Sequence, residues 1–445
     1  MKGYWVGFCA LGALYCSANS TSSNVANETA YHQDIAPLFA QKCMSLCHVV
    51  DGIAPFSLAT YDDVYSHRDA VNFAVTHELM PPWPPSNDCT TYRDNRSLTA
   101  SEISMIQDWL KQGAPPGTPT PTTSNTNNSV TTSTGFNKRI AMSESYTPRL
   151  SPDDYRCFVL DWNEQTVSYV TGFRALPGSA SVVHHILTFV IAAKDAAKYA
   201  NLDAKDDGPG YSCFGGPGGL PSGTLGSWAP GQGIIHYPEG TGIKVEAGAK
   251  IIMQVHYNIG HHDAVMDMTA IELNTAPQVD REGFIIPWTN PLWLSGQMTI
   301  PALETAVSHS FNDDPTKYFE PIAKIWPGLW PKGPIKNNTA FRMYSANLHM
   351  HLLGTHSTLS ILRQDSQVDC LLDIPQWDFH WQGDYFFKDY KVFNPGDRLK
   401  ITCNWDNSAV NQPFIHNQQQ TSHDVNWGEG TTDEMCLGGI YITAH

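Results

Sequence analysis

Residues 250–259, KIIMQVHYNI, are the clearest of several strand-like stretches in this chain. Isoleucine, valine and tyrosine favour strands, and neither proline nor glycine interrupts the run. Similar stretches recur after about residue 143, separated by Gly, Pro, Asn and Asp: TVSYVTGF at 166–173, STLSILR at 357–363 and RLKITCNW at 398–405. The pattern predicts antiparallel β structure for this part of the chain. Because about 300 residues are too many for one ordinary sandwich, we expect two, at 143–286 and 287–445, with their junction near Pro287.

The part before the strands has a different pattern. Residues 30–113 are predicted to form a small α-helical domain, since 62–78 lack Pro and Gly and Thr99 to Glu102 match a capping box that opens a helix. Residues 114–135 are rich in Pro, Thr, Ser and Asn, and we expect them to be a flexible linker.

The first residues predict export. Residues 1–18 have one basic residue, an apolar stretch and small residues ending at Ala18, which is the pattern of a cleaved signal peptide. Cys16 offers a lipoprotein alternative that also implies export. We therefore expect a periplasmic or secreted protein whose remaining cysteines are bridged or otherwise engaged.

Composition and charge exclude several classes of partner. Hydrophobic residues make up 41% and aromatic residues 11% of the chain, enough to fill globular cores. No apolar run beyond the first residues is long enough for a membrane span. The net charge of −16 argues against nucleic acid and anionic membrane surfaces, because both need a basic footprint.

Histidines interrupt the strands in two places. His349 and His351 alternate in NLHMHLLG, so their side chains share one face of a strand. His184 and His185 are adjacent in SVVHHILTFV, and His256 lies in the stretch quoted first. Neighbouring strand residues point to opposite faces, so a local twist is needed to place both rings around one metal ion. The alternative is three separately hydrogen-bonded core histidines.

Met435, in TDEMCLGG, adds a soft thioether near the C-terminus. A lone methionine is more often a core residue than a ligand. Together with His349 and His351, however, it favours copper over zinc, whose usual ligands do not include methionine. Its neighbour Cys436 has Cys403 as a natural bridge partner.

From about Ser143 onward, five motifs occur in the same order as in a known family. In these motifs the chain resembles the type II copper, ascorbate-dependent monooxygenases, which include peptidylglycine α-hydroxylating monooxygenases and dopamine β-hydroxylase. The motifs are DDYRCFVLD, VVHHILTFV, MQVHYN, HMHLLG and DEMC. The resemblance implies two jelly-roll-like sandwiches with one copper each, two coppers per chain, facing one another across a solvent-filled cleft.

The resemblance also implies roles for individual residues. It assigns the electron-transfer copper to His184, His185 and His256, and the copper where oxygen reacts, the catalytic one, to His349, His351 and Met435. Gln254 matches a position that helps to orient the first site. The implied disulfides are Cys157 with Cys213 and Cys403 with Cys436, while Cys89 and Cys370 have no assigned partner and either bridge the domains or remain free.

This chain lacks the residues with which the peptide-amidating members of the family contact their substrate. Those enzymes hold the substrate carboxylate with an arginine where this chain has Asn347, and have a tyrosine at Gly439 and an asparagine at Leu437. Loss of a charge-assisted contact weakens carboxylate binding by roughly 1.5–3 kcal/mol. The departures argue against a peptidylglycine substrate.

The helical part contains a motif close to the attachment site of c-type haem. Cys43, Cys47 and His48 are one residue longer than C-x-x-C-H, and Met80 follows as a candidate second axial ligand in ELMPPWPP. With its helices, this part resembles a small cytochrome c. The rival interpretation has no haem, a Cys43–Cys47 disulfide and Met80 in the core.

The sequence therefore predicts an exported copper-dependent monooxygenase that hydroxylates a C–H bond of a small organic or peptide substrate with O2. Electrons come from ascorbate or another reductant, or from a redox partner protein, with haem c as the candidate entry point. The alternative is a copper-binding, copper-delivery or electron-transfer protein without hydroxylase activity. A third interpretation, a structural sandwich protein with incidental histidines, requires the ordered motifs to match by accident.

Overall fold

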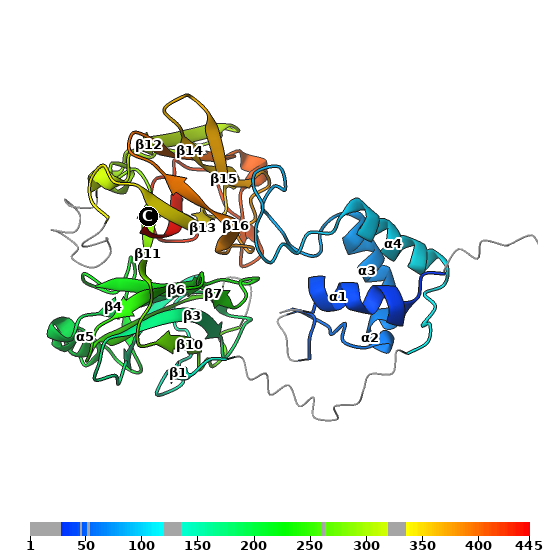
Figure 1. Cartoon of the computed structure of the whole chain (residues 1–445), viewed down its shortest axis with the longest axis horizontal. Helices are drawn as coiled ribbons and strands as arrows, with labels where there is room; N and C mark the ends of the chain where they lie inside the picture. The colour runs from blue at the N-terminus through cyan, green and yellow to red at the C-terminus, as the bar shows by residue number, and fades with distance from the viewer. Residues whose placement is uncertain (1–27, 45–46, 51–53, 120–134, 260–262, 319–334) are drawn as a thin grey trace, which may run out of the picture.

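The structure is a computed structural model that describes residues 28–44, 47–50, 54–119, 135–259, 263–318 and 335–445. The predicted signal peptide, residues 1–18, lies outside the described residues, as does most of the predicted linker. Figure 1 shows a helical unit beside two β units that lie against each other. No helix of the described part is long and apolar enough to cross a membrane.

The helical unit has its own core. Its elements are η1 (Tyr31–Ile35), α1 (Ala36–Lys42), α2 (Tyr61–Ser66), α3 (Arg68–Thr76) and α4 (Ala100–Lys111). The capping box of Thr99 and Glu102 is present and opens α4 as predicted. The helix predicted over 62–78 is broken at His67, whose ring bonds back to the Asp63 carbonyl between α2 and α3. Ile35, Val64, Ile106 and Trp109 pack at the centre of the unit.

The first β unit is a sandwich. Its elements are β1 (Lys138–Ala141), β2 (Asp153–Asp161), β3 (Ser168–Leu176), β4 (Val183–Ile191), η2 (Ala193–Asp195), α5 (Ala196–Asp203), β5 (Tyr211–Ser212), β6 (Gly223–Trp228), β7 (Ile235–His236), β8 (Thr241–Val245), β9 (Lys250–Asn258) and β10 (Ala270–Ala276). A sheet in the order β5-β2-β9-β4-β6 faces β1, β10, β3 and β8 of a larger sheet. Residues from both layers fill one core.

The second β unit repeats this plan. Its elements are β11 (Arg281–Trp288), η3 (Trp293–Ser295), β12 (Val307–Asp313), β13 (Phe341–His349), β14 (Gly354–Leu362), β15 (Val368–Ile374), β16 (Tyr385–Phe393), β17 (Arg398–Trp405), η4 (Ala409–Asn411), β18 (Phe414–Ile415), β19 (Gln418–Gln419) and β20 (Leu437–Ala444). The sheet β12-β17-β14-β15 faces β11, β20, β13 and β16. The predicted antiparallel β fold is thus confirmed.

One sheet is shared by both β units. Strand β11 runs parallel to β8 of the first unit and antiparallel to β20 of the second, so the larger sheet continues from one unit into the other. Pro287, the predicted junction, lies within β11 and is paired with Gly439. Backbone hydrogen bonds therefore fix the two β units relative to each other.

Three disulfides hold the described residues. Cys157–Cys213 lies in the first unit and Cys403–Cys436 in the second, as the family resemblance implied. Cys89–Cys370 joins the N-terminal part to the second unit, which settles the open alternative in favour of a bridge between domains. Cys43 and Cys47 are free.

Residues 82–97, which we call the arm, leave the helical unit and pack on the second β unit. Tyr92 belongs to the core of that unit and donates from its hydroxyl to the Leu371 carbonyl at 3.0 Å. In Figure 1 this blue segment lies beside β15 and β16. The helical unit is therefore anchored on the β units from both sides of Cys89.

Candidate metal centre and adjoining cavity

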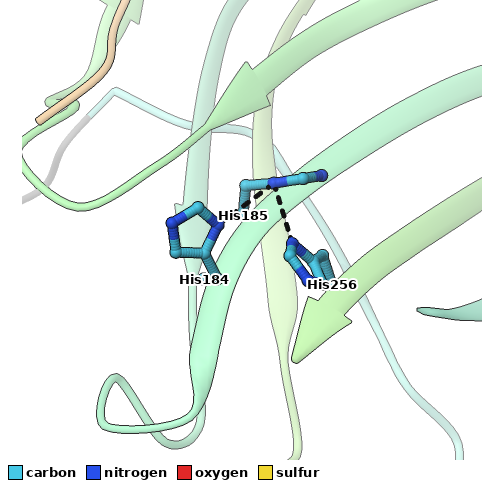
Figure 2. A group of neighbouring side chains, drawn as sticks. All are labelled: His184, His185 and His256. Carbon is cyan, nitrogen blue, oxygen red and sulfur yellow. Dashed lines mark hydrogen bonds between the residues drawn. The ribbon is translucent and has the colours of Figure 1, made fainter. Parts of the chain in front are cut away.

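The first histidine group forms where β4 and β9 pair. His185 lies opposite His256 in this register, and the pairing is shifted between Val183 and His185. This irregularity turns His184 and His185, adjacent in the chain, toward the same place, as Figure 2 shows. One nitrogen from each ring of His184, His185 and His256 lies within 4.8 Å of the others, a spacing that one metal ion can bridge.

The Nδ1 atoms of the three rings point toward one another, and His256 also has an outer partner. The Nδ1 atom of His185 is 3.3 Å from that of His184 and 3.2 Å from that of His256. His256 uses its Nε2 to donate to Asp153 Oδ1 at 2.8 Å, so its Nδ1 keeps the lone pair. The arrangement has the donor set and the outer carboxylate of a metal site.

The second group consists of His349, the last residue of β13, and His351, which lies two residues beyond the strand, and His349 contacts the His185 ring of the first group. The two Nε2 atoms are 3.1 Å apart. His349 Nδ1 donates to Gln382 Oε1 at 2.6 Å, and His351 Nδ1 donates to the Asp433 carbonyl at 3.0 Å. Each outer nitrogen thus carries the proton, and two lone pairs face one another. Such lone pairs repel unless a cation lies between or beside them.

Met435 lies next to this second group. It is buried and lines the same cavity as His349 and His351. The residues on both sides of Met435 are fixed. Cys436 is held by its disulfide to Cys403, and Glu434 is held by hydrogen bonds. The buried Glu434 carboxylate accepts from the backbone N–H groups of His351 and Leu353 and from the indole N–H of Trp405.

Burial favours the neutral form of four of these imidazoles, those of His184, His185, His349 and His351. It lowers the pKa of His184 and His185 well below the usual range, and repulsion from His256 adds to this effect. The pKa of His349 is also lowered by burial, and that of His351 falls to about 3 through burial and the nearby His349. Neutral imidazole is the form that binds a metal.

The two groups are close neighbours. The ring centroids of His185 and His349 are 6.4 Å apart, and Phe379 stacks on His184 at 4.3 Å while also contacting the His351 ring at 5.9 Å. The solvent-filled cleft that the resemblance implied between the groups is replaced here by direct ring contacts.

A cavity of about 570 Å³ opens between the β units beside both groups. His185, His349, His351 and Met435 form part of its wall. Most of the other lining side chains are apolar, among them Leu187, Phe189, Trp228, Ile285, Leu348 and Trp427. Glu429 is the one acidic residue, and no lysine or arginine occurs in the described lining.

Asn347 and Gly439 form one side of this cavity. The Asn347 amide N–H donates to Asp384 Oδ1 at 2.6 Å, and Ser227 of the first unit donates to Asp384 Oδ2 at 3.1 Å. A Cβ atom at Gly439 would lie 2.5 Å from Asn347 Oδ1, so glycine is required for the observed position of Asn347. Burial raises the pKa of Asp384.

Gln254, predicted to help orient the first group, bonds elsewhere. Its side-chain amide donates to the Cys213 carbonyl at 2.9 Å, and the residue also lines the cavity. Its immediate contact is therefore with the Cys157–Cys213 disulfide segment.

In the helical unit, His48 is buried and its Nδ1 donates to the Phe56 carbonyl at 2.9 Å, which leaves Nε2 free. Cys43 and Cys47 are half-buried thiols, and burial raises the pKa of Cys43 to about 12. Met80 is half-buried in the turn that follows α3. Two free thiols and a histidine with one free nitrogen fit the donor chemistry of a c-type haem.

Several residues of the site were not singled out from the sequence. Phe379 and Gln382 lie in a loop without strand periodicity, so no pattern marked them. Asp153 and Glu434 lie within two of the quoted motifs, DDYRCFVLD and DEMC, and their position in those motifs was the available signal.

Comparisons with known proteins agree with this geometry. Residues 334–443 match the family model described as "Copper type II ascorbate-dependent monooxygenase, C-terminal domain". A curated relative, tyramine beta-hydroxylase of Caenorhabditis briggsae, is 24% identical over 274 residues, which cover 60% of this chain. The chain spans 40% of the length of that relative.

Among solved structures, oxalate decarboxylase from Bacillus subtilis is 6% identical with a TM-score of 0.13, covering 72% of this chain and 84% of that one. A likeness this low carries no information about fold or function. The family match, in contrast, includes His349 at the end of β13, His351 just beyond it and the segment with Met435. Over residues 334–443 the chain is therefore similar to the C-terminal domain of the copper type II ascorbate-dependent monooxygenases.

Proposed function

We propose that this protein is a copper-dependent monooxygenase that converts a substrate C–H group, O2, two electrons and two protons into a C–OH group and water. The observation that carries the proposal is the pair of facing Nε2 atoms of His349 and His351, beside Met435, at the wall of a cavity large enough for a small molecule.

Each histidine group would hold one copper ion. His184, His185 and His256 form one ligand set, and His349, His351 and Met435 form the other. Copper supplies one-electron redox chemistry and reactivity toward O2, and a thioether ligand favours Cu(I). The protein residues orient the rings through Asp153, Gln382 and the Asp433 carbonyl.

The cavity favours a small, largely apolar substrate that carries a hydrogen-bond donor, such as an amine. Its described lining has Glu429 and the Asn347 carbonyl oxygen as acceptors, and it lacks a cationic side chain for a carboxylate. The name of the curated relative, a tyramine hydroxylase, points to the same class. An amine is therefore a better candidate than a peptide with a free C-terminal carboxylate.

Electron input through haem c is a further part of the proposal. All other described cysteines are in disulfides, whereas Cys43 and Cys47 are free and close to His48 in the chain. Thioether bonds to haem would engage both thiols. Three disulfides also support the proposed export to the periplasm or the cell exterior.

The first experiment is to measure copper and haem in full-length protein from an export-competent host and to follow O2 consumption with ascorbate and tyramine. We expect two coppers per chain, one lost in His256→Ala and the other in Met435→Ala, a c-type haem spectrum, and O2 uptake that requires substrate. Bound copper without substrate-dependent O2 uptake with any amine tested would favour the copper-delivery alternative. Absence of tightly bound copper would refute the proposal.

A further inference from the structure

The arm is held on the second β unit along much of its length. The backbone N–H of Ser86 donates to the Asp373 carbonyl at 2.8 Å, and that of Arg93 donates to the Phe386 carbonyl at 2.8 Å. The Cys89–Cys370 disulfide adds a covalent link. The arm is therefore fixed on the second β unit by both covalent and hydrogen bonds.

The other end of the arm is attached to the candidate haem segment. Lys42, the residue before Cys43, donates from Nζ to the carbonyls of Asn95 and Ser97, at 3.1 and 2.9 Å. Asn95 and Ser97 flank Arg96, so these two hydrogen bonds tie the backbone on both sides of Arg96 to the end of α1.

Arg96 connects this segment to the β units. Its Nη1 donates to the Gly231 carbonyl at 2.9 Å. A Cβ atom at Gly231 would lie 2.9 Å from the ring of Trp381, so the backbone of Gly231 lies directly against that indole. Gln41 of α1, Arg96 and Trp381 line one cavity of about 370 Å³.

Gln382 completes the series of contacts. It follows Trp381 in the chain and lines both this cavity and the larger one, and its Oε1 accepts a hydrogen bond from His349 Nδ1 at 2.6 Å. Its own amide donates to the Phe379 carbonyl at 2.7 Å, which fixes its orientation. Hydrogen bonds, covalent bonds and one packing contact, that of Gly231 on Trp381, thus lead from the arm to one ring of the second group.

We infer that Arg96, Trp381 and Gln382 form a built-in electron bridge from the helical unit to His349, so that electrons enter at the second histidine group. The inference rests on the proposed haem and copper sites. In each transfer, ferrous haem loses one electron and becomes ferric, while Cu(II) at the second group becomes Cu(I). Ascorbate or another one-electron reductant then re-reduces the haem.

The first histidine group has no hydrogen bond to Gln382 and meets this series only through the stacking of His184 on Phe379, at 4.3 Å. None of His184, His185 and His256 lines the cavity shared by the helical unit and Trp381. The outer partner of His256 is Asp153, whose other oxygen accepts from Thr431. Electron transfer falls steeply with distance and passes better through bonded atoms than through gaps, so the bridge favours His349.

The test is pulse reduction of the fully oxidised, metal-loaded full chain without O2, followed by haem absorbance and by freeze-quench EPR of copper. Wild-type protein should reoxidise its haem in a first-order phase that does not depend on protein concentration. Arg96→Met should slow this phase by about tenfold, equivalent to about 1.4 kcal/mol in the barrier, and Arg96→Lys should restore part of it. Arg68→Met, on the exposed surface of the helical unit, is the matched control.

Two further variants identify the entry point. His256→Ala, which empties the first group, should keep the fast phase, and His351→Ala, which empties the second, should lose it. The reverse pattern, or a fast phase unchanged in Arg96→Met, would overturn the bridge alone. A protein that contains copper but no haem would overturn the bridge together with the proposed haem site, while leaving the copper enzyme intact.

Discussion

His185 and His349 lie on strands of different β units, yet their ring centroids are only 6.4 Å apart. The shared sheet through β11 and the Phe379 ring hold the units in this arrangement. Two Cu(II) ions held by neighbouring rings interact magnetically. We therefore expect the EPR spectrum of fully loaded, oxidised protein to be broader than the sum of the spectra of His256→Ala and Met435→Ala. A spectrum equal to that sum would show that the groups are separate in solution.

Asp153 should control copper affinity at the first group. It fixes the proton of His256 on Nε2, and loss of such an outer partner typically weakens metal binding by about 10–100-fold. Asp153→Asn should therefore weaken one of the two copper sites by this factor in a competition titration. Asp161→Asn, at the exposed end of the same strand, should bind copper like the wild type. Equal affinities in both variants would remove Asp153 from this role.

Glu434 should matter for stability. Its carboxylate accepts several N–H groups, including those of His351, Leu353 and Trp405. In Glu434→Gln an amide N–H₂ must face at least one of these donors, which costs about 1–3 kcal/mol of unfolding free energy. Urea unfolding of the metal-free protein measures this loss. Glu239→Gln at an exposed position is the control, and a loss no larger than in that control would contradict the prediction.

Asp384 should make stability depend on pH. Burial raises its pKa in the folded protein, so between the ordinary carboxyl range and the raised pKa the folded state binds a proton that the unfolded state lacks. Its contribution to stability is therefore lost as pH rises through that window. Asp384→Asn keeps both hydrogen-bond partners and should show a smaller decline in melting temperature from about pH 4 to about pH 8. Asp389→Asn, exposed on β16, should retain the wild-type slope; identical slopes in all three proteins would refute this.

Gly439 and Asn347 should be coupled. Gly439→Ala places a Cβ atom 2.5 Å from Asn347 Oδ1 and must displace that side chain from Asp384. We expect a lower melting temperature and weaker substrate binding, and a smaller loss in the double variant with Asn347→Ala than the single losses predict. Gly438→Ala, whose Cβ would have no neighbour closer than 3.5 Å, is the control. Additive losses would show that the two positions are independent.

The sequence predicted the strands and the grouping of histidines because both follow from local patterns. Alternate positions on one strand share a face, which predicted that His349 and His351 lie together. They do, although the strand itself ends at His349. The pair His184 and His185 required a shift in strand register, which the strand pattern alone does not specify. The structure contains that shift next to His185.

The partners of the ligand residues were less accessible because they come from distant, irregular segments. Gln382 and Phe379 lie in the loop before β16, where no periodicity indicates direction. The Cys89–Cys370 pair is separated by 281 residues, and nothing in the spacing relates the two positions. Only the packing of the arm on the second unit brings them together.

The Cys89–Cys370 disulfide also determines what proteolytic cleavage of the chain releases. Because it joins the N-terminal part to the second unit, a proteolytic cut anywhere in residues 114–135 leaves the fragments covalently linked. On a denaturing gel, nicked protein would run as one species until a thiol is added. The helical unit thus remains with its partner at any dilution, and chemical reduction together with cleavage is needed to release it.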